Sequence, residues 1–168
     1  MGDGIAVKAS AELAHQSDYA ANPLSISLNY WLGEGGVTWK GLSGLVGYEV
    51  LNGNGTIGFA IPLVTLHTFN GWADMFLTTP LNGLKDLHLK APVDFMAAKN
   101  LNLAVIWYDY HTDAFHQAIG NERDLQSELV MDASLSFMAK YASYAGAGAA
   151  FDGSPDKSIF WVQTAYKY

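Results

Sequence analysis

The chain has 168 residues, of which 50% are hydrophobic, 13% aromatic and 15% charged, and its formal net charge is −7. The acidic balance and the lack of any Lys/Arg cluster argue against a nucleic-acid binder. The absence of cysteine excludes disulfides, thiolate metal sites and cysteine nucleophiles. No run of about eighteen apolar residues is present, so no transmembrane helix is predicted. The length fits one domain, residues 1–168.

Alternation of apolar and polar residues predicts antiparallel β-strands along most of the chain. Gly33-Glu34-Gly35-Gly36 has the composition of a hairpin turn, and Gly41, Gly44 and Gly47 suggest a bulge. The region 122–146 is too long for one strand, so we place a turn at 131–133 within it. About eight strands result, at 5–15, 24–32, 37–50, 83–91, 101–111, 122–130, 134–146 and 158–168.

The stretch 51–82 interrupts this alternation and is predicted to be one long loop. It is apolar, with Phe69, Trp72 and Phe76, yet Asn70, Gly71, Pro80 and Asn82 within it break regular structure. A loop of this length in a compact domain is usually functional or disordered. The apolar content favours a functional loop.

The connections differ in length between the two ends of the strands. The segments 33–36, 92–100 and 131–133 fall on one side, and the longer segments 16–22, 51–82, 112–121 and 145–157 on the other. Outer-membrane barrels show this asymmetry, and the Tyr and Trp residues near the strand ends are typical of their aromatic girdles. The predicted fold class is an all-β, antiparallel, up-and-down transmembrane β-barrel. The alternation alone also fits a soluble barrel with its apolar side chains inside.

The long loop carries a resemblance to a known family. Its residues follow the pattern H-x-F-N-G-W-A-D-x-F-L-x-T-P-x-x-G-L-x-D, which resembles alginate-export-like outer-membrane porins. The matching residues are His67, Phe69, Asn70, Gly71, Trp72, Ala73, Asp74, Phe76, Leu77, Thr79, Pro80, Gly83, Leu84 and Asp86. Barrels of that family are more than twice as long, so the resemblance covers the C-terminal part of such a barrel, from about residue 16 to residue 168. It implies passive diffusion of a small or acidic organic solute across the outer membrane of a Gram-negative bacterium.

If the polar side of the strands faces inward, charged side chains line the interior. Those residues are Lys8, Glu12, Glu49, Asp86, His88, Lys90, Asp109, His111, Glu128 and Lys140. Within an interior of about eight strands they are expected to pair as a salt-bridged plug, or else to form a charged path for a solute. The two His and two Asp among them have the ligand types of a zinc site, but such residues are also common in lumens, so no metal is expected.

The loop residues His67, Phe69, Asn70, Trp72, Asp74 and Phe76 are predicted to form a constriction or a partner contact. In a wide barrel the loop could fold inward, whereas in a narrow one it must cover the mouth, touch lipid or meet a partner. Asp74 is also interpreted as a carboxylate that caps a turn.

No enzyme motif is present, and no cofactor is expected. The expected partners are membrane lipid, a solute and further copies of the chain. The alternative function is a non-conducting small barrel, a natural fragment or an engineered chain, that acts as a scaffold or binding module. Residues 1–4 lack the basic and apolar regions of a signal peptide, which the outer-membrane interpretation assigns to a precursor.

Overall fold

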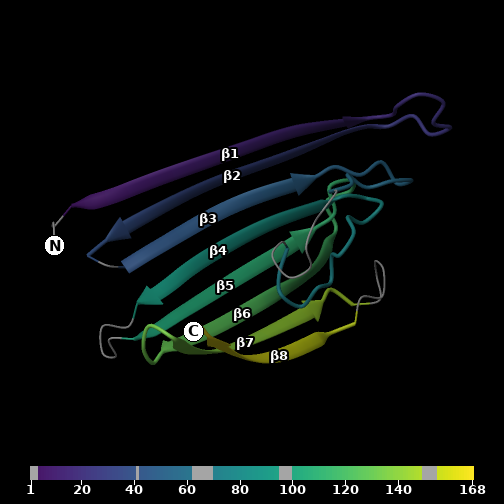
Figure 1. Ribbon diagram of the computed structural model, residues 1–168. Coiled ribbons are helices and arrows are strands. Elements are labelled where there is room, and N and C mark those ends of the chain that lie inside the picture. The colour runs from purple at the N-terminus through teal and green to yellow at the C-terminus, as the bar shows by residue number, and fades with distance from the viewer. Residues whose placement is uncertain (1–3, 41, 62–69, 95–99, 149–154) are drawn as a thin grey trace.

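The computed structural model describes residues 4–40, 42–61, 70–94, 100–148 and 155–168. These residues form eight β-strands in one antiparallel sheet, in the order of the sequence (Figure 1). The strands are β1 Ile5–Ser17, β2 Ser27–Trp39, β3 Leu42–Leu51, β4 Leu84–Asp94, β5 Leu101–His111, β6 Ala118–Val130, β7 Leu135–Gly146 and β8 Lys157–Tyr166. The predicted all-β, up-and-down arrangement is confirmed at this level. No helix in the described part of the chain is long and apolar enough to cross a membrane.

The sheet is open. Each strand pairs only with its sequence neighbours, so β1 and β8 form two free edges over the described residues. In Figure 1 the two edges lie at opposite sides of the molecule, and the sheet curves between them. The structure therefore shows a curved wall rather than a closed barrel.

The turn predicted at 33–36 is wrong. Strand β2 runs through these glycines, where Gly33 pairs with Ala11 on β1 and with Tyr48 on β3. The chain reverses instead between Trp39 and Leu42, where Lys40 has a φ of 50°. Glycine fits a turn but does not require one, and the two flanking strands hold this segment extended by backbone hydrogen bonds.

The bulge suggested at Gly41, Gly44 and Gly47 is also corrected over β3, because the pairing of this strand with both neighbours is regular, while Gly41 lies outside the described residues. At Gly47 the missing side chain makes room for the imidazole of His88, which occupies the place where a Cβ would stand. The pairing shifts instead between Tyr110 and His111 on β5. The turn predicted at 131–133 is confirmed, since β6 ends at Val130 and β7 begins at Leu135.

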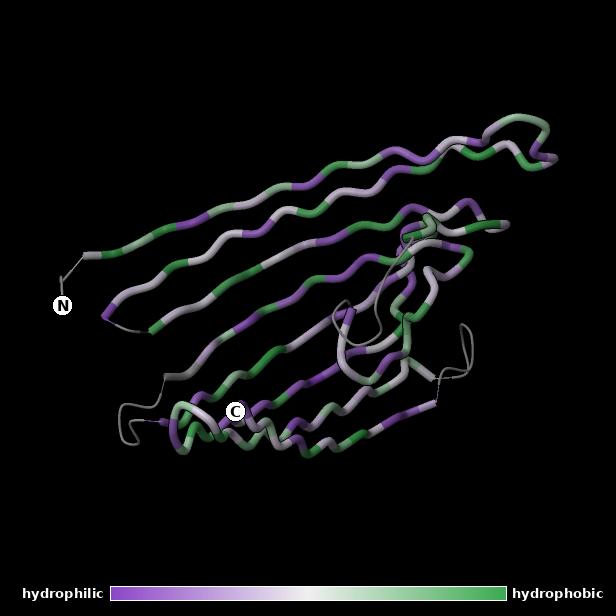
Figure 2. Tube along the Cα trace, viewed as in Figure 1, coloured by the Kyte–Doolittle hydropathy of each residue, from purple (hydrophilic) through white to green (hydrophobic). Residues whose placement is uncertain are grey.

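The two faces of the sheet differ in what covers them. We call the face that contacts residues 70–76 the inner face, and the opposite face the outer face. Successive side chains of a strand point to opposite faces, and Figure 2 shows the resulting alternation of hydrophilic and hydrophobic residues. Large apolar side chains lie exposed on the outer face, including Val7, Leu13, Val46, Leu89, Val105, Phe137, Phe160 and Val162.

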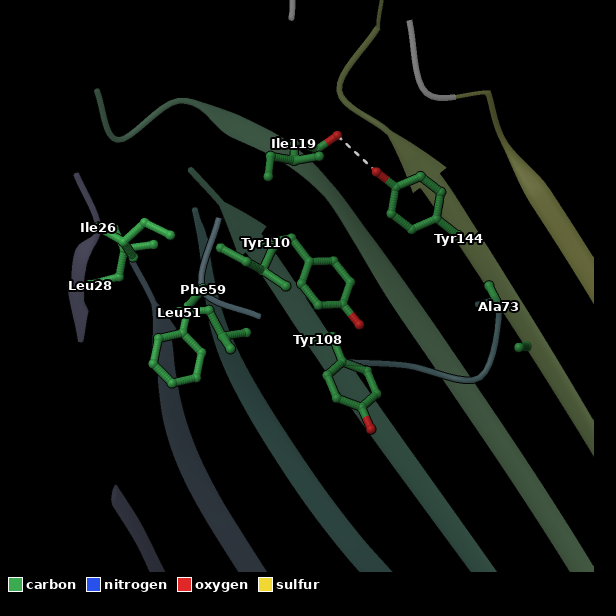
Figure 3. Close-up of a cluster of buried hydrophobic side chains, with 11 residues drawn as sticks. Ile26, Leu28, Leu51, Phe59, Ala73, Tyr108, Tyr110, Ile119 and Tyr144 are labelled. Atoms are coloured by element: carbon green, nitrogen blue, oxygen red, sulfur yellow. Dashed lines mark hydrogen bonds between the residues drawn. The ribbon is translucent and has the colours of Figure 1, made fainter. Parts of the chain in front are cut away.

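Residues 70–83, the described part of the chain that leads into β4, lie over the inner face (Figure 1). Residues 70–76, which we call the inward loop segment, pack against buried aromatic side chains near the loop end of the sheet. Figure 3 shows Tyr108, Tyr110 and Tyr144 beside Ala73, with Leu51 and Phe59 at the other side of the cluster. This cluster and the segment above it form the candidate site.

Candidate functional site

The site begins with Asn70, whose amide joins two strands. Its Nδ2 atom donates to Glu49 Oε2 at 2.7 Å and to Asp86 Oδ2 at 3.0 Å. Glu49 on β3 and Asp86 on β4 are directly paired positions of the sheet, and both are buried. One amide therefore holds two neighbouring carboxylates, which would otherwise repel one another at this position.

The backbone of the inward loop segment binds a second pair of carboxylates. The N–H of Trp72 donates to Asp124 Oδ2 at 3.1 Å, and that of Ala73 donates to Glu122 Oε1 at 2.6 Å. Both acids lie on β6, two positions apart and fully buried. Hydrogen bonds from N–H groups to carboxylates are stronger than neutral ones, so these bonds fix the segment against the wall.

Gly71 lies between these two anchors and requires the absence of a side chain. Its φ is 90°, and a Cβ built there would stand 2.5 Å from Glu122 Oε2 and 2.5 Å from Tyr110 Oη. Asn70, directly before it, and Asp74, three residues after it, also have positive φ angles, of 52° and 53°. The left-handed backbone favours Gly, Asn and Asp, which explains why the tetrapeptide from Asn70 to Ala73 can turn so tightly against β6.

Aromatic contacts complete the docking of the segment. The Phe76 ring lies 4.6 Å from that of Tyr110 and 6.0 Å, edge-on, from that of Tyr144. The Trp72 ring lies under the ammonium group of Lys140 at 4.6 Å. Such aromatic and cation–π pairs contribute roughly 0.5–1.5 kcal/mol each beyond the buried area. The segment thus spans the inner face from β3 to β7.

A polar chain of contacts continues from Asp86 toward the other end of the strands. Asp86 Oδ1 lies 3.2 Å from His88 Nδ1, and His88 Nε2 lies 3.2 Å from Glu34 Oε1. Lys90 Nζ is 3.6 Å from the same Glu34 oxygen, and Ser10 donates to the other at 3.2 Å. The inner face therefore carries connected acids and bases rather than isolated charges.

The predicted interior residues separate into two groups. On the inner face lie Lys8, Glu12, Glu49, Asp86, His88, Lys90, Glu128 and Lys140. Asp109 and His111 are corrected, because their strand pairing places them on the outer face, where both side chains are more than a third exposed. They are polar because they lie at the loop end of β5, beyond the apolar part of the outer face.

The predicted loop residues that the structure describes all belong to the inward loop segment. Asn70, Trp72 and Phe76 each touch the wall, and Asp74 follows directly in the same turn. His67 and Phe69 lie outside the described residues. Among the described residues no group of three or more His, Cys, Asp and Glu side chains could hold a metal ion.

Several site residues were not predicted. Glu122 and Asp124 are separated from Glu128 by even numbers of residues on β6, so they point to the same face as Glu128. The prediction that Glu128 faces inward therefore implies the same orientation for Glu122 and Asp124. Tyr108 and Tyr110 are also buried on the inner face, where Phe76 of the inward loop segment packs on Tyr110. Both sides of β5 are apolar along most of its length, so alternation gave no orientation there.

A groove of about 840 Å³ lies beside the site, toward the free edge of β1. Its polar lining includes Glu12, Gln16, Tyr30 and Glu49, and Phe59 and Ile61 give it an apolar side. Tyr30 stacks on Phe59 at 5.7 Å, and its hydroxyl lies 3.5 Å from Glu12 Oε2. The arrangement offers hydrogen-bonding and acidic groups to a solute.

Comparison of the chain with protein-family models, curated proteins and solved structures found no match.

Proposed function

We propose that the chain forms the wall of a transmembrane β-barrel in the outer membrane of a Gram-negative bacterium. By its loop motif it resembles alginate-export-like porins, and its proposed activity is passive diffusion of small or acidic organic solutes without catalysis. The inward loop segment narrows the path along the inner face. Lipid covers the outer face.

The polarity of the outer face carries the proposal. On seven strands the outward residues change from apolar or aromatic to polar at the loop end. The pairs are Leu13 and His15, Trp31 and Asn29, Leu87 and Lys85, Trp107 and Asp109, Leu125 and Arg123, Tyr141 and Ser143, and Phe160 and Ser158. An apolar band with an aromatic border and a polar rim is typical of membrane barrels.

Strand length supports the same proposal. The strands have 10 to 13 residues, and a tilted strand crosses a bilayer with about 9–11 residues. In a soluble protein, an apolar face of this extent would remain in water, where large exposed patches promote association.

Circular dichroism with and without detergent tests the membrane assignment. We expect a β-sheet spectrum and a monodisperse particle in detergent or lipid, and aggregation in plain buffer. A well-folded, monodisperse protein in plain buffer would contradict the proposal, because the outer face would then tolerate water.

Conductance in planar bilayers tests the transport activity. We expect steady openings, with a larger conductance when residues 70–76 are replaced by a short Gly/Ser linker. A protein that folds in lipid but stays silent, with or without this replacement, would favour the second candidate, a non-conducting scaffold or binding module. That candidate is supported by the inward loop segment, which already fills part of the inner face.

A further inference from the structure

Each of the two acids on β6 that anchor the inward loop segment has one oxygen atom without a donor. The N–H groups of Trp72 and Ala73 occupy Asp124 Oδ2 and Glu122 Oε1. The other two oxygens, Asp124 Oδ1 and Glu122 Oε2, are buried and have no hydrogen-bond partner among the described residues. A buried polar atom without a partner costs free energy, so this pair requires a donor that the loop backbone does not supply.

A single shared proton supplies that donor. Glu122 and Asp124 lie two positions apart on one face of β6, fully buried and within hydrogen-bonding reach of each other. A carboxylate only accepts hydrogen bonds, whereas a protonated carboxyl group also donates one. With one proton between them, one acid donates to the other, and the pair carries one negative charge instead of two. Burial and a neighbouring carboxylate both favour the retention of a proton.

The groups around the pair are compatible with one negative charge but oppose a second. Lys140 on β7 attracts the charge of Asp124, and its ammonium group lies over the Trp72 ring. The other described titratable groups that face the pair are mainly acids and phenols: Asp74 in the loop, Glu49 on β3, Asp86 and His88 on β4, Tyr108 and Tyr110 on β5, and Tyr144 on β7. Because acids outnumber cations here, a second charge on the pair would be repelled.

The proton is coupled to the position of the loop. The docked segment covers the pair so closely that a Cβ at residue 71 would stand 2.5 Å from Glu122 Oε2. After undocking, water would reach both acids, and they would ionise as ordinary carboxyl groups do, at about pH 4. Docking at a higher pH therefore takes up a proton. By linkage, docking is strongest at low pH and weakens as the pH rises and the pair gives up its proton.

We propose that Glu122 and Asp124 form a proton latch, a pair of acids that shares one proton and thereby holds the inward loop segment against the wall. Acidic pH keeps the latch closed, and rising pH opens it. As a control on solute passage, this inference rests on the proposed diffusion along the inner face, which the closed latch narrows. The docking equilibrium itself does not depend on transport.

Hydrogen–deuterium exchange of the protein refolded in detergent tests the latch. Mass spectrometry measures the protection of the amides in residues 70–76, corrected for the intrinsic pH dependence of exchange. These amides include the two that donate to the pair. A one-proton linkage changes an equilibrium by up to about tenfold per pH unit. We therefore expect protection to be about tenfold or more greater at pH 6 than at pH 9.

Glu122→Gln is the diagnostic variant, because glutamine imitates the protonated acid. Its amide keeps an oxygen for the N–H of Ala73 and offers a permanent donor to Asp124 Oδ1. We expect protection to be high at both pH values. Asp124→Asn makes the reciprocal change and serves if the first variant does not refold. Glu128→Gln is the matched control on the same face of β6, where Asn102 rather than the loop is the partner, and it should keep the full pH dependence.

Equal protection at both pH values in the unaltered chain would overturn the latch. Full pH dependence in both Glu122→Gln and Asp124→Asn would also overturn it, because another group, such as His88, would then be the cause.

Conductance in planar bilayers separates this inference from the proposed function. We expect conductance to rise as the pH is raised and protection falls. A chain with pH-dependent protection that stays silent would overturn the diffusion activity and leave the latch intact. A conducting chain with pH-independent protection would overturn the latch alone.

Discussion

Asn70 is the residue on which the position of the loop depends most directly. Its single amide group donates to two carboxylates from adjacent strands. An apolar residue there would leave Glu49 and Asp86 buried side by side with no donor from the loop. The site therefore requires an amide at residue 70, and the adjacent backbone supplies the remaining donors.

The variant Asn70→Asp should release the inward loop segment. It replaces a donor with a third carboxylate, and a buried group that loses its partner costs about 1–3 kcal/mol. We expect a lower urea midpoint in detergent, with the loss larger at neutral pH than at acidic pH, where protonation of the carboxyl groups relieves their repulsion. Asn102→Asp is the matched control, because Asn102 is exposed and its one hydrogen bond to a carboxylate, that of Glu128, is long, at 3.5 Å. Equal losses in both variants would contradict the assigned role.

Gly71→Ala tests the close approach of the loop to β6. A methyl group at residue 71 would meet Glu122 and Tyr110, and overpacking of this kind costs about 1–3 kcal/mol. Gly55→Ala is the control. Gly55 has a φ of 87°, but a Cβ added there would contact only Asn82 Oδ1, at an ordinary distance of 3.7 Å. Both variants carry the strain of a positive φ, about 1–2 kcal/mol. We expect the urea midpoint to fall further for Gly71→Ala, and a shift in Trp fluorescence for that variant alone.

Neighbouring residues of one strand lie on opposite faces of the sheet and meet different surroundings. Ala139 on β7 faces outward between Ser127 and Val162, whereas Met138 faces inward between Glu128 and Gln163. Arginine on the lipid face of a barrel costs about 2–4 kcal/mol near the bilayer midplane. At Met138, arginine would lie beside Glu128 on the polar face.

We therefore expect Ala139→Arg to destabilise the protein by about 2 kcal/mol or more in lipid vesicles, while Met138→Arg has a small effect. Urea unfolding followed by Trp fluorescence measures both. The opposite order would show that the outer face does not meet lipid, and would invert the assignment of the two faces.

The alternation along β1, β4, β7 and β8 was sufficient to predict those strands and their faces. On β4, for example, Leu87 and Leu89 face outward while Asp86 and His88 face inward. The orientation of β5 could not be predicted, because it is apolar on both sides and its polar residues Asp109 and His111 lie at the rim. The path of β2 through Gly33 and Gly36 depends on hydrogen bonds to β1 and β3, which are not encoded locally.

The docking of the loop could not be predicted from the sequence, for a different reason. The motif from Asn70 to Asp74 indicated a tight turn, but its partners lie on strands far away in the chain, at Glu122 and Asp124. Whether the loop would enter depended on the width of the barrel, which alternation does not define.

For the whole molecule, the charge of the inner face predicts its ion preference. Acidic residues on it are Glu12, Glu34, Glu49, Asp86, Glu122, Asp124 and Glu128, and basic residues are Lys8, Lys90, Lys140 and Lys157. Rings of acidic side chains favour cations in channels. We expect the reversal potential in a salt gradient to indicate cation preference, which would favour small neutral or cationic solutes over the acidic solutes that the loop motif implies.

The variant Glu12→Gln should move that potential toward zero, because Glu12 lies on the open part of the inner face. Asp109→Asn removes the same charge from the outer face and should leave the potential unchanged. Equal shifts from both would contradict the assignment of Asp109 to the outer rim.

The inward loop segment also has a consequence for the order of folding. It ties β3 and β4 to β6 and β7 on the inner face, so we expect these strands to curve once the segment docks. Bringing distant edges together costs conformational entropy, and a wall that is already curved has lost part of that freedom. A chain with a released loop would then assemble slowly, even if the finished barrel were equally stable.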